Sequence, residues 1–177
     1  MKQLILLRHA KSSWDDKVER DFDRPLNKKG LRAAGTMGRH AAEIGLKWDE
    51  VVASPAKRVS ETIAGFAEGY GAPIDPRPER GIYMASVDAL LEVLAGCSGD
   101  TVLLVGHNPG LEDLVFYLTP ADDGRARREV DVKYPTASIA QLSIPVNSWD
   151  ELKEDGAHLE RFVRPRDIDP SLGPDQD

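Results

Sequence analysis

Four side chains that could bind and transfer a phosphoryl group follow short apolar runs in this sequence. Arg8 and His9 follow the run Leu4–Leu7, and Arg58 and His107 each follow a later run. A planar guanidinium group matches the oxygens of a phosphate, and a neutral imidazole can attack phosphorus to form a phosphohistidine. If the fold gathers these two arginines and two histidines, they would form an anion site suited to phosphoryl transfer.

The apolar runs predict buried strands that would bring these residues to one edge of a sheet. Parallel strands covered on both faces are continuously apolar, so strands are predicted at residues 4–7, 51–53 and 101–105. Ser54-Pro55 and Pro109 are placed to begin helices after the second and third strands. In an open α/β sheet, ligands bind at the carboxyl ends of the strands, and we therefore expect the candidate residues to meet there.

The residues directly after the first strand are small. Ala10, Ser12 and Ser13 would let backbone amides approach an anion closely. Taken alone, Arg8 and His9 would also fit a strand that simply ends at the surface. The two later motifs favour a site.

The remaining pattern predicts a three-layer α/β/α sandwich with a mainly parallel central sheet, because strands alternate with helices. Asn27 is a good N-cap for a first helix whose apolar face includes Leu31, and Ser86 caps a later one. Helices are predicted at residues 28–45, 56–70, 87–95 and 109–118, and further strands at 73–76, 136–144 and 159–163. Residues 121–133 are charged and predicted to be a loop. We expect one domain over residues 1–164 and a disordered tail over 165–177, where Pro, Asp and Gly dominate.

Composition limits the class of protein. The 177 residues carry 23 basic and 30 acidic side chains, a net charge of −7, which argues against general binding to nucleic acid or to a membrane surface. No apolar stretch is long enough to span a bilayer, and no signal-peptide pattern begins the chain. Cys97 is the single cysteine, which excludes an internal disulfide and a thiolate metal site. We expect a cytoplasmic protein.

Four motifs in order give the sequence a family resemblance. They are Arg8-His9-Ala10, Leu26-Asn-Lys-Lys-Gly30, Ser54-Pro-Ala-Lys-Arg58 and Gly106-His107. Over about residues 2–145 the chain resembles the histidine phosphatase superfamily, the phosphoglycerate-mutase-like proteins. The short segment between Arg58 and His107 leaves no room for a large lid insertion. In this, and in Arg-His-Ala in place of Arg-His-Gly, the chain is similar to the short, SixA-like phosphohistidine phosphatases.

The resemblance and the chemistry together predict roles for these residues. His9 would be the nucleophile, with its other ring nitrogen donating to a backbone carbonyl. Arg8, Arg58 and His107 would bind the transferring oxygens, and neither a metal nor another cofactor is expected. The expected substrate is phosphohistidine on a protein partner, and the protein is expected to be a monomer. A small-molecule phosphomonoesterase of the same fold and a non-catalytic phosphate-binding module remain alternatives.

A few further residues have open roles. Glu79, in Pro-Glu-Arg-Gly-Ile-Tyr, is a candidate general acid, or a surface glutamate paired with Arg77 or Arg80. Asp15 falls where many mutases have a phosphate-binding Asn, and that role is not assigned to it. Thr62 could support the site from its helix or be an ordinary helix hydroxyl. His40 and Cys97 are expected to be structural or incidental.

Overall fold

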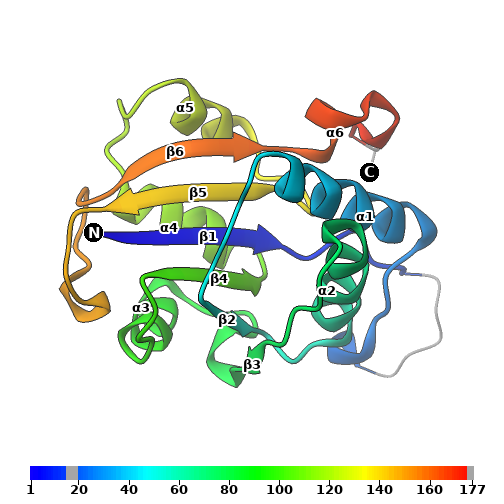
Figure 1. Ribbon diagram of the computed structural model, residues 1–177, viewed down its shortest axis with the longest axis horizontal. Coiled ribbons are helices and arrows are strands. Elements are labelled where there is room, and N and C mark those ends of the chain that lie inside the picture. The colour runs from blue at the N-terminus through cyan, green and yellow to red at the C-terminus, as the bar shows by residue number, and fades with distance from the viewer. Residues whose placement is uncertain (15–19, 175–177) are drawn as a thin grey trace.

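A single mixed sheet forms the centre of the structure, a computed structural model that describes residues 1–14 and 20–174. Its described strands are β1 (Lys2–Arg8), β2 (Glu50–Ala53), β3 (Arg77–Pro78), β4 (Thr101–Gly106), β5 (Ile139–Ile144) and β6 (His158–Val163). Their order is β3-β2-β4-β1-β5-β6. The first four strands of this order are parallel, whereas β5 is antiparallel to both β1 and β6 (Figure 1). The predicted mainly parallel sheet is confirmed.

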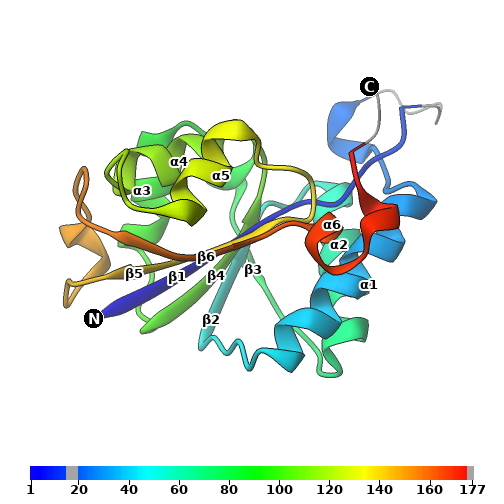
Figure 2. The same cartoon turned by 90° about the horizontal axis from the view of Figure 1, so that it is seen from above.

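Helices cover both faces of the sheet, as Figure 2 shows. One face carries α1 (Lys28–Glu43) and α2 (Lys57–Tyr70), and the other carries α3 (Val87–Ala95), α4 (Gly110–Leu118) and α5 (Arg125–Val132). Alternate residues of β1 separate the two cores: Leu4 and Leu6 pack towards α3 and α4, while Ile5 and Leu7 pack towards α1 and α2. This is the predicted three-layer sandwich, and among the described residues no large insertion covers the carboxyl ends of the strands.

Glycines set the close approach of α1 to α2. A Cβ atom at Gly38 would lie 2.0 Å from the carbonyl oxygen of Phe66, and one at Gly69 would lie 2.1 Å from that of Gly35. The two backbones can therefore approach only because these positions lack side chains. This packing fixes the position of α2, whose first turn carries Arg58.

The segment predicted to be a charged loop contains the helix α5. Its Arg127 is buried: the guanidinium lies 4.5 Å from the centre of the Phe116 ring, and its Nε donates to Thr119 Oγ1 at 2.9 Å. Nη1 also pairs with Asp131 at 2.5 Å. The loop prediction was wrong because a long basic side chain can bury its stem while its charge is satisfied, so this helix needs few apolar residues.

The predicted disordered tail is also wrong for residues 165–174. Pro165 begins α6 (Pro165–Ile168), and Asp167 returns a bond to the Arg164 backbone. A short 3-10 helix follows at Pro170–Leu172, and Leu172 is buried in the core on the α1 side. The buried Pro165 and Leu172, the capped turn and bonds from Lys29 to the Gly173 carbonyl and from Arg32 to Ser171 hold this Pro-rich segment on the domain.

Smaller differences concern an edge strand and a helix face. The edge strand predicted at 73–76 forms at Arg77–Pro78 instead. Leu31 was predicted to face inward, but it is 50% exposed because Gly30, Ala33 and Ala34 form the packed face of α1. Among the described residues, no helix is long and apolar enough to cross a membrane.

Candidate active site

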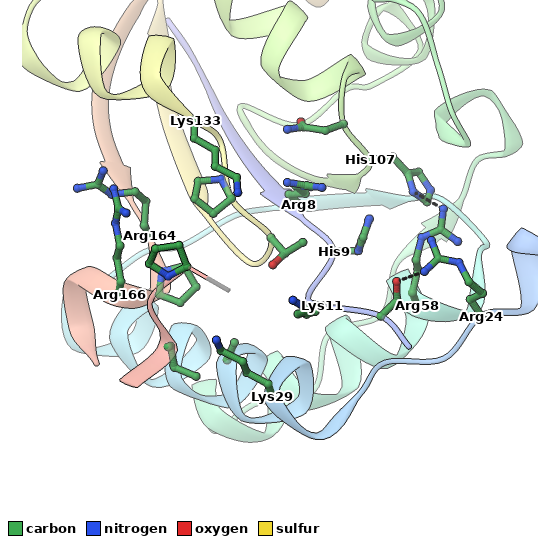
Figure 3. A pocket seen from close by; sticks show the side chains of 18 of the residues that line it. Arg8, His9, Lys11, Arg24, Lys29, Arg58, His107, Lys133, Arg164 and Arg166 are labelled. Carbon is green, nitrogen blue, oxygen red and sulfur yellow. Dashed lines mark hydrogen bonds between the residues drawn. The ribbon is translucent and has the colours of Figure 1, made fainter. Parts of the chain in front are cut away.

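The structure brings Arg8, His9, Arg58 and His107 together in one cavity of about 460 Å³ (Figure 3). Arg8 and His9 end β1, and His107 follows β4, whose Gly106 is paired in register with Arg8. The His9 amide donates to the Gly106 carbonyl at 3.0 Å. Because β1 and β4 are parallel neighbours, their carboxyl ends place both histidines at the same edge, with ring centres 5.4 Å apart.

The ring of His9 is held in a defined tautomer. Its Nδ1 lies 2.7 Å from the carbonyl oxygen of Ala10, so Nδ1 carries the proton and donates it to that oxygen. Nε2 then keeps its lone pair. Burial, assisted by the nearby charge of Arg8, lowers the pKa of His9 to about 3. His9 is therefore neutral at physiological pH, as a nucleophilic imidazole must be.

Thr62 fixes the backbone that holds this ring. Its hydroxyl donates to the Arg58 carbonyl at 2.6 Å and accepts from the Ala10 amide at 2.9 Å. Thr62 thus acts both as a helix hydroxyl and as a support for the site, joining α2 to the peptide after His9. The expected anion contacts of the Ala10 and Ser13 amides are not present, because these amides donate to Thr62 and to the Pro25 carbonyl.

Arg58 is held by a carboxylate and by His107. Its Nη1 donates to the main-chain oxygen of Asp21 at 2.8 Å, and its Nη2 donates to Asp21 Oδ2 at 3.0 Å and to His107 Nδ1 at 3.3 Å. Since His107 Nδ1 accepts, its Nε2 carries the proton and donates to Ser54 Oγ at 2.7 Å. Both histidines therefore have one ring nitrogen oriented by a protein partner.

The charges around Arg58 shift two further pKa values. Burial, assisted by Arg58, lowers the pKa of His107 to about 4. For Asp21, burial acts to raise the pKa, but hydrogen bonds from Tyr83 and Arg24 and the charge of Arg58 prevail and lower it to about 2. Tyr83 donates to Asp21 Oδ2 at 2.7 Å, and Arg24 Nε donates to Oδ1 at 3.0 Å. Asp21 is therefore an ionised carboxylate at neutral pH.

Two buried guanidinium nitrogens in the cavity have no hydrogen-bond partner among the described residues. Arg8 Nη1 donates to the Tyr134 carbonyl at 2.8 Å, which also accepts from Asn108 Nδ2 at 3.1 Å. The Nε atoms of Arg8 and Arg58 are buried and make no hydrogen bond within the described part of the chain. Buried donors without acceptors are unfavourable, so both arginines are suited to an anionic ligand.

Cations dominate the cavity. Among the described residues that line it, the single acid is Asp21, and the basic residues are Arg8, Lys11, Arg24, Lys29, Arg58, Lys133, Arg164 and Arg166. A local positive site thus exists in a protein of net charge −7. Sequence reasoning missed Asp21, Arg24 and the basic residues contributed after α5 and around α6. The sequence did contain one signal for Arg24. The run Arg24-Pro-Leu directly precedes the N-cap Asn27, and this short connection places the Arg24 backbone beside the first motif.

Glu79 does not line this cavity. Its carboxylate accepts from Arg77 Nε at 3.1 Å, and with Gly81 and Val93 it lines a separate hollow beside α3. This arrangement matches the alternative of a surface glutamate paired with Arg77, and a role as general acid stays a prediction. Asp15 lies outside the described residues. His40 and Cys97 also lie away from the cavity, and burial raises the pKa of Cys97 to about 11.

Several known proteins are similar to this chain. The model of the histidine phosphatase superfamily (branch 1) matches residues 4–79. An uncharacterised protein of Mycobacterium tuberculosis is 32% identical over 164 residues, covering 90% of this chain and 100% of the relative. The structure of a protein assigned as the phosphohistidine phosphatase SixA from Nakamurella multipartitia is 29% identical, with a TM-score of 0.77 and coverage of 93% of this chain and 96% of that one.

A second such structure, from Agrobacterium tumefaciens and also assigned as SixA, is 28% identical with a TM-score of 0.75, covering 93% of this chain and 98% of that one. Both similarities cover 93% of this chain. They confirm the phosphoglycerate-mutase-like fold expected from the motifs. The chain belongs to the histidine phosphatase superfamily and is SixA-like.

Proposed function

We propose that this protein is a phosphatase that forms a covalent phosphohistidine on His9 and acts on phosphohistidine in a protein. The observation that carries the proposal is the His9 ring, neutral and held through Nδ1, in a cavity shared with Arg8, Arg58 and His107. This arrangement leaves Nε2 available for attack. The family membership supports phosphatase activity.

The first chemical step transfers the phosphoryl group to His9. Nε2 attacks phosphorus, an N–P bond forms, and the bond from phosphorus to the leaving group breaks with its electron pair on the leaving atom. Arg8 and Arg58 would bind the oxygens that carry the negative charge. The bound anion would also stabilise the protonated form of His107, whose Nδ1–H could then donate to the phosphoryl oxygens. Water then attacks phosphorus, the bond to Nε2 breaks, and inorganic phosphate leaves.

The acids in the structure favour a substrate whose leaving group needs little protonation by a carboxyl group. Asp21 is ionised, with a pKa of about 2, and Glu79 lies outside the cavity. The P–N bond of phosphohistidine is labile, and imidazole is a better leaving group than an alkoxide. A sugar phosphate or other alkyl ester would depend more strongly on an acid, typically by ~10²–10⁴-fold.

The rim of the cavity also favours a protein substrate. The side chains of Trp14 and Met84 line it and are 77% and 54% exposed. Large exposed apolar side chains beside a charged site are suited to contact with another protein surface. The described residues contain no large lid insertion, which favours access by a phosphorylated side chain on such a surface.

The test is to trap the phosphoenzyme on the intact protein. We expect an acid-labile, alkali-stable label on His9 that His9→Ala abolishes together with turnover, while the matched variant His40→Ala keeps both. A label on His107, with His9→Ala still active, would refute the assignment. Rates on phosphohistidine proteins should then exceed those on sugar phosphates and nucleotides. The reverse order would favour the small-molecule phosphomonoesterase, and phosphate binding without turnover would indicate a non-catalytic module.

A further inference from the structure

Asp21 is a cavity residue to which the proposed reaction gives no role. It lines the cavity together with Arg58 and His107, and it is the single acid among the described lining residues. A carboxylate in this place repels the oxygens of a bound phosphoryl group, because like charges repel strongly where water is partly excluded. The presence of Asp21 in the cavity therefore needs an explanation other than substrate binding.

Asp21 binds one edge of the Arg58 guanidinium with two of its own oxygens. Its main-chain oxygen accepts from Arg58 Nη1 at 2.8 Å, and its Oδ2 accepts from Nη2 at 3.0 Å. A guanidinium group is planar and its N–H donors are fixed in that plane. Two bonds from its two terminal nitrogens to one residue therefore set the orientation of the whole group.

The other edge of the guanidinium consists of Nε–H and the second hydrogen of Nη2. Arg58 Nε is buried and makes no hydrogen bond within the described residues. Because Asp21 Oδ2 takes one hydrogen of Nη2, the other hydrogen points to His107 Nδ1, at a nitrogen–nitrogen distance of 3.3 Å (Figure 3). When a bound anion protonates His107 at Nδ1, this ring nitrogen stops accepting. Nε and Nη2 can then both donate to phosphoryl oxygens.

Asp21 is itself held firmly enough to fix Arg58. Its Oδ1 accepts from Arg24 Nε at 3.0 Å, and its Oδ2 also accepts from the Tyr83 hydroxyl at 2.7 Å. Arg24 is buried and donates in turn to Ser12 Oγ. Burial acts to raise the pKa of Asp21, but the bonds from Tyr83 and Arg24 prevail and lower it to about 2. The carboxylate is therefore charged, and it has no proton to donate at neutral pH.

From these contacts we infer that Asp21 is a positioning residue, which holds Arg58 by its terminal nitrogens and thereby presents the Nε edge to the phosphoryl group beside His107. Asp21 acts through Arg58 and makes no contact with the substrate. The benefit is a donor that is oriented before the substrate arrives, and the cost is repulsion of the bound phosphate. This inference rests on the proposed function and adds a residue to it.

The neighbouring Asp23 provides a matched control for the first test. Both acids belong to one short 3-10 helix, Asp21–Asp23. Asp21 pairs with Arg24 at 3.0 Å and Asp23 pairs with Arg20 at 3.0 Å, each three residues away. The two acidic side chains are 43% and 44% exposed, but Asp23 does not line the cavity. The variants Asp21→Asn and Asp23→Asn would be compared in the whole protein by kcat on p-nitrophenyl phosphate and by calorimetry with inorganic phosphate.

We expect Asp21→Asn to lower kcat by about 10²-fold, the effect of a misplaced catalytic group. The same variant should bind inorganic phosphate at least as tightly as the wild type, because a like charge has been removed. Asp23→Asn should change neither quantity. A general loss of structure would weaken phosphate binding together with turnover. An unchanged kcat in Asp21→Asn, a parallel loss of kcat and phosphate affinity, or an equal loss of kcat in Asp23→Asn would overturn the inference.

A second test asks whether Asp21 acts through Arg58. Arg58→Lys keeps the positive charge but has no planar fork for Asp21 to hold. When Asp21→Asn is added to Arg58→Lys, kcat should therefore change by no more than about twofold further. If the two losses multiply, Asp21 acts independently of Arg58, which contradicts the inference.

The last test does not depend on turnover. The Nε–H resonance of Arg58, assigned by its absence in Arg58→Lys, would be followed by NMR during titration with inorganic phosphate. It should move in the wild type and in Asp23→Asn, and it should move less in Asp21→Asn at saturating phosphate. A resonance that phosphate leaves in place in the wild type, or moves equally in Asp21→Asn, would overturn the inference. The expected response in a protein that shows no phosphatase activity would instead refute the proposed function and leave the positioning of Arg58 by Asp21 standing.

Discussion

The hydroxyl of Thr62 offers a sharp test of how the fold controls the nucleophile. Thr62→Val removes the acceptor of the Ala10 amide and keeps the shape of the side chain. A buried amide left without a partner costs about 1–3 kcal/mol of stability. The Ala10 peptide can lower this cost by moving, but its carbonyl also holds His9 Nδ1 at 2.7 Å. Because misplacement of a reacting group by about 1 Å can reduce a rate ~10²-fold, we expect kcat/KM to fall by about that factor.

Thr119 provides a matched control within the same chain. Its hydroxyl also donates to the carbonyl four residues earlier, at 2.7 Å, and accepts from a distant donor, Arg127 Nε, at 2.9 Å. Thr62 and Thr119 are 0% and 1% exposed. Thr119→Val should therefore lose a similar free energy of unfolding, about 1–3 kcal/mol, but it should keep its activity because it does not line the cavity. Thr62→Ser, which restores the hydroxyl, should recover most of the rate.

The assay is the initial rate of p-nitrophenyl phosphate hydrolysis by each purified variant, with urea unfolding measured in parallel. We expect Thr62→Val to hydrolyse the substrate much more slowly than Thr119→Val, while the two variants have similar free energies of unfolding. If both variants lose activity equally, the effect of Thr62 is a general loss of stability. If Thr62→Val remains fully active, the contact between α2 and the Ala10 peptide does not position His9.

Three other predictions concern pH, metals and Glu79. The folded protein lowers the pKa of His9 to about 3 and that of His107 to about 4, whereas both are about 6.5 in the unfolded chain. Between the folded and unfolded pKa values the unfolded state binds more protons, so the free energy of unfolding must fall as the pH falls below about 6.5. Unfolding measured from pH 7 to 5 should show a loss of up to about 2 kcal/mol for each histidine, and His9→Asn should flatten the curve; a flat wild-type curve would contradict these pKa values. Activity should survive EDTA and be inhibited by phosphate-like oxyanions, and a loss that Mg²⁺ or Mn²⁺ restores would show that the site needs a metal. Glu79→Gln should leave the relative rates on p-nitrophenyl phosphate and alkyl phosphates unchanged, because the Glu79 carboxylate pairs with Arg77 outside the cavity. A fall in rate of ~10²-fold or more that is confined to the alkyl phosphate would instead make Glu79 the general acid.

Local patterns were sufficient to predict most of the sheet and the gathering of the four candidate residues. Leu4–Leu7 and residues 101–105 are continuously apolar because both faces of β1 and β4 are covered. Once two such strands are parallel neighbours, their ends must meet, and the basic and titratable residues after them share one edge. The bond from His9 Nδ1 to a nearby backbone carbonyl was also predictable, since the Ala10 carbonyl that accepts it is adjacent in sequence.

Contacts between distant segments could not be predicted in this way. Asp21 binds Arg58 across 37 residues, Thr62 meets Ala10 across 52, and Arg8 reaches the Tyr134 carbonyl across 126. The helix α5 and the residues after Pro165 depend on buried side chains, among them Arg127 and Leu172, whose partners lie outside these segments. Sequence alone determined which residues could do the chemistry and which strands carry them, because strand periodicity is a local property. The tertiary structure alone decided the protonated nitrogen of His107 and the position of Glu79 outside the cavity, because both depend on side chains that only folding brings within hydrogen-bonding range.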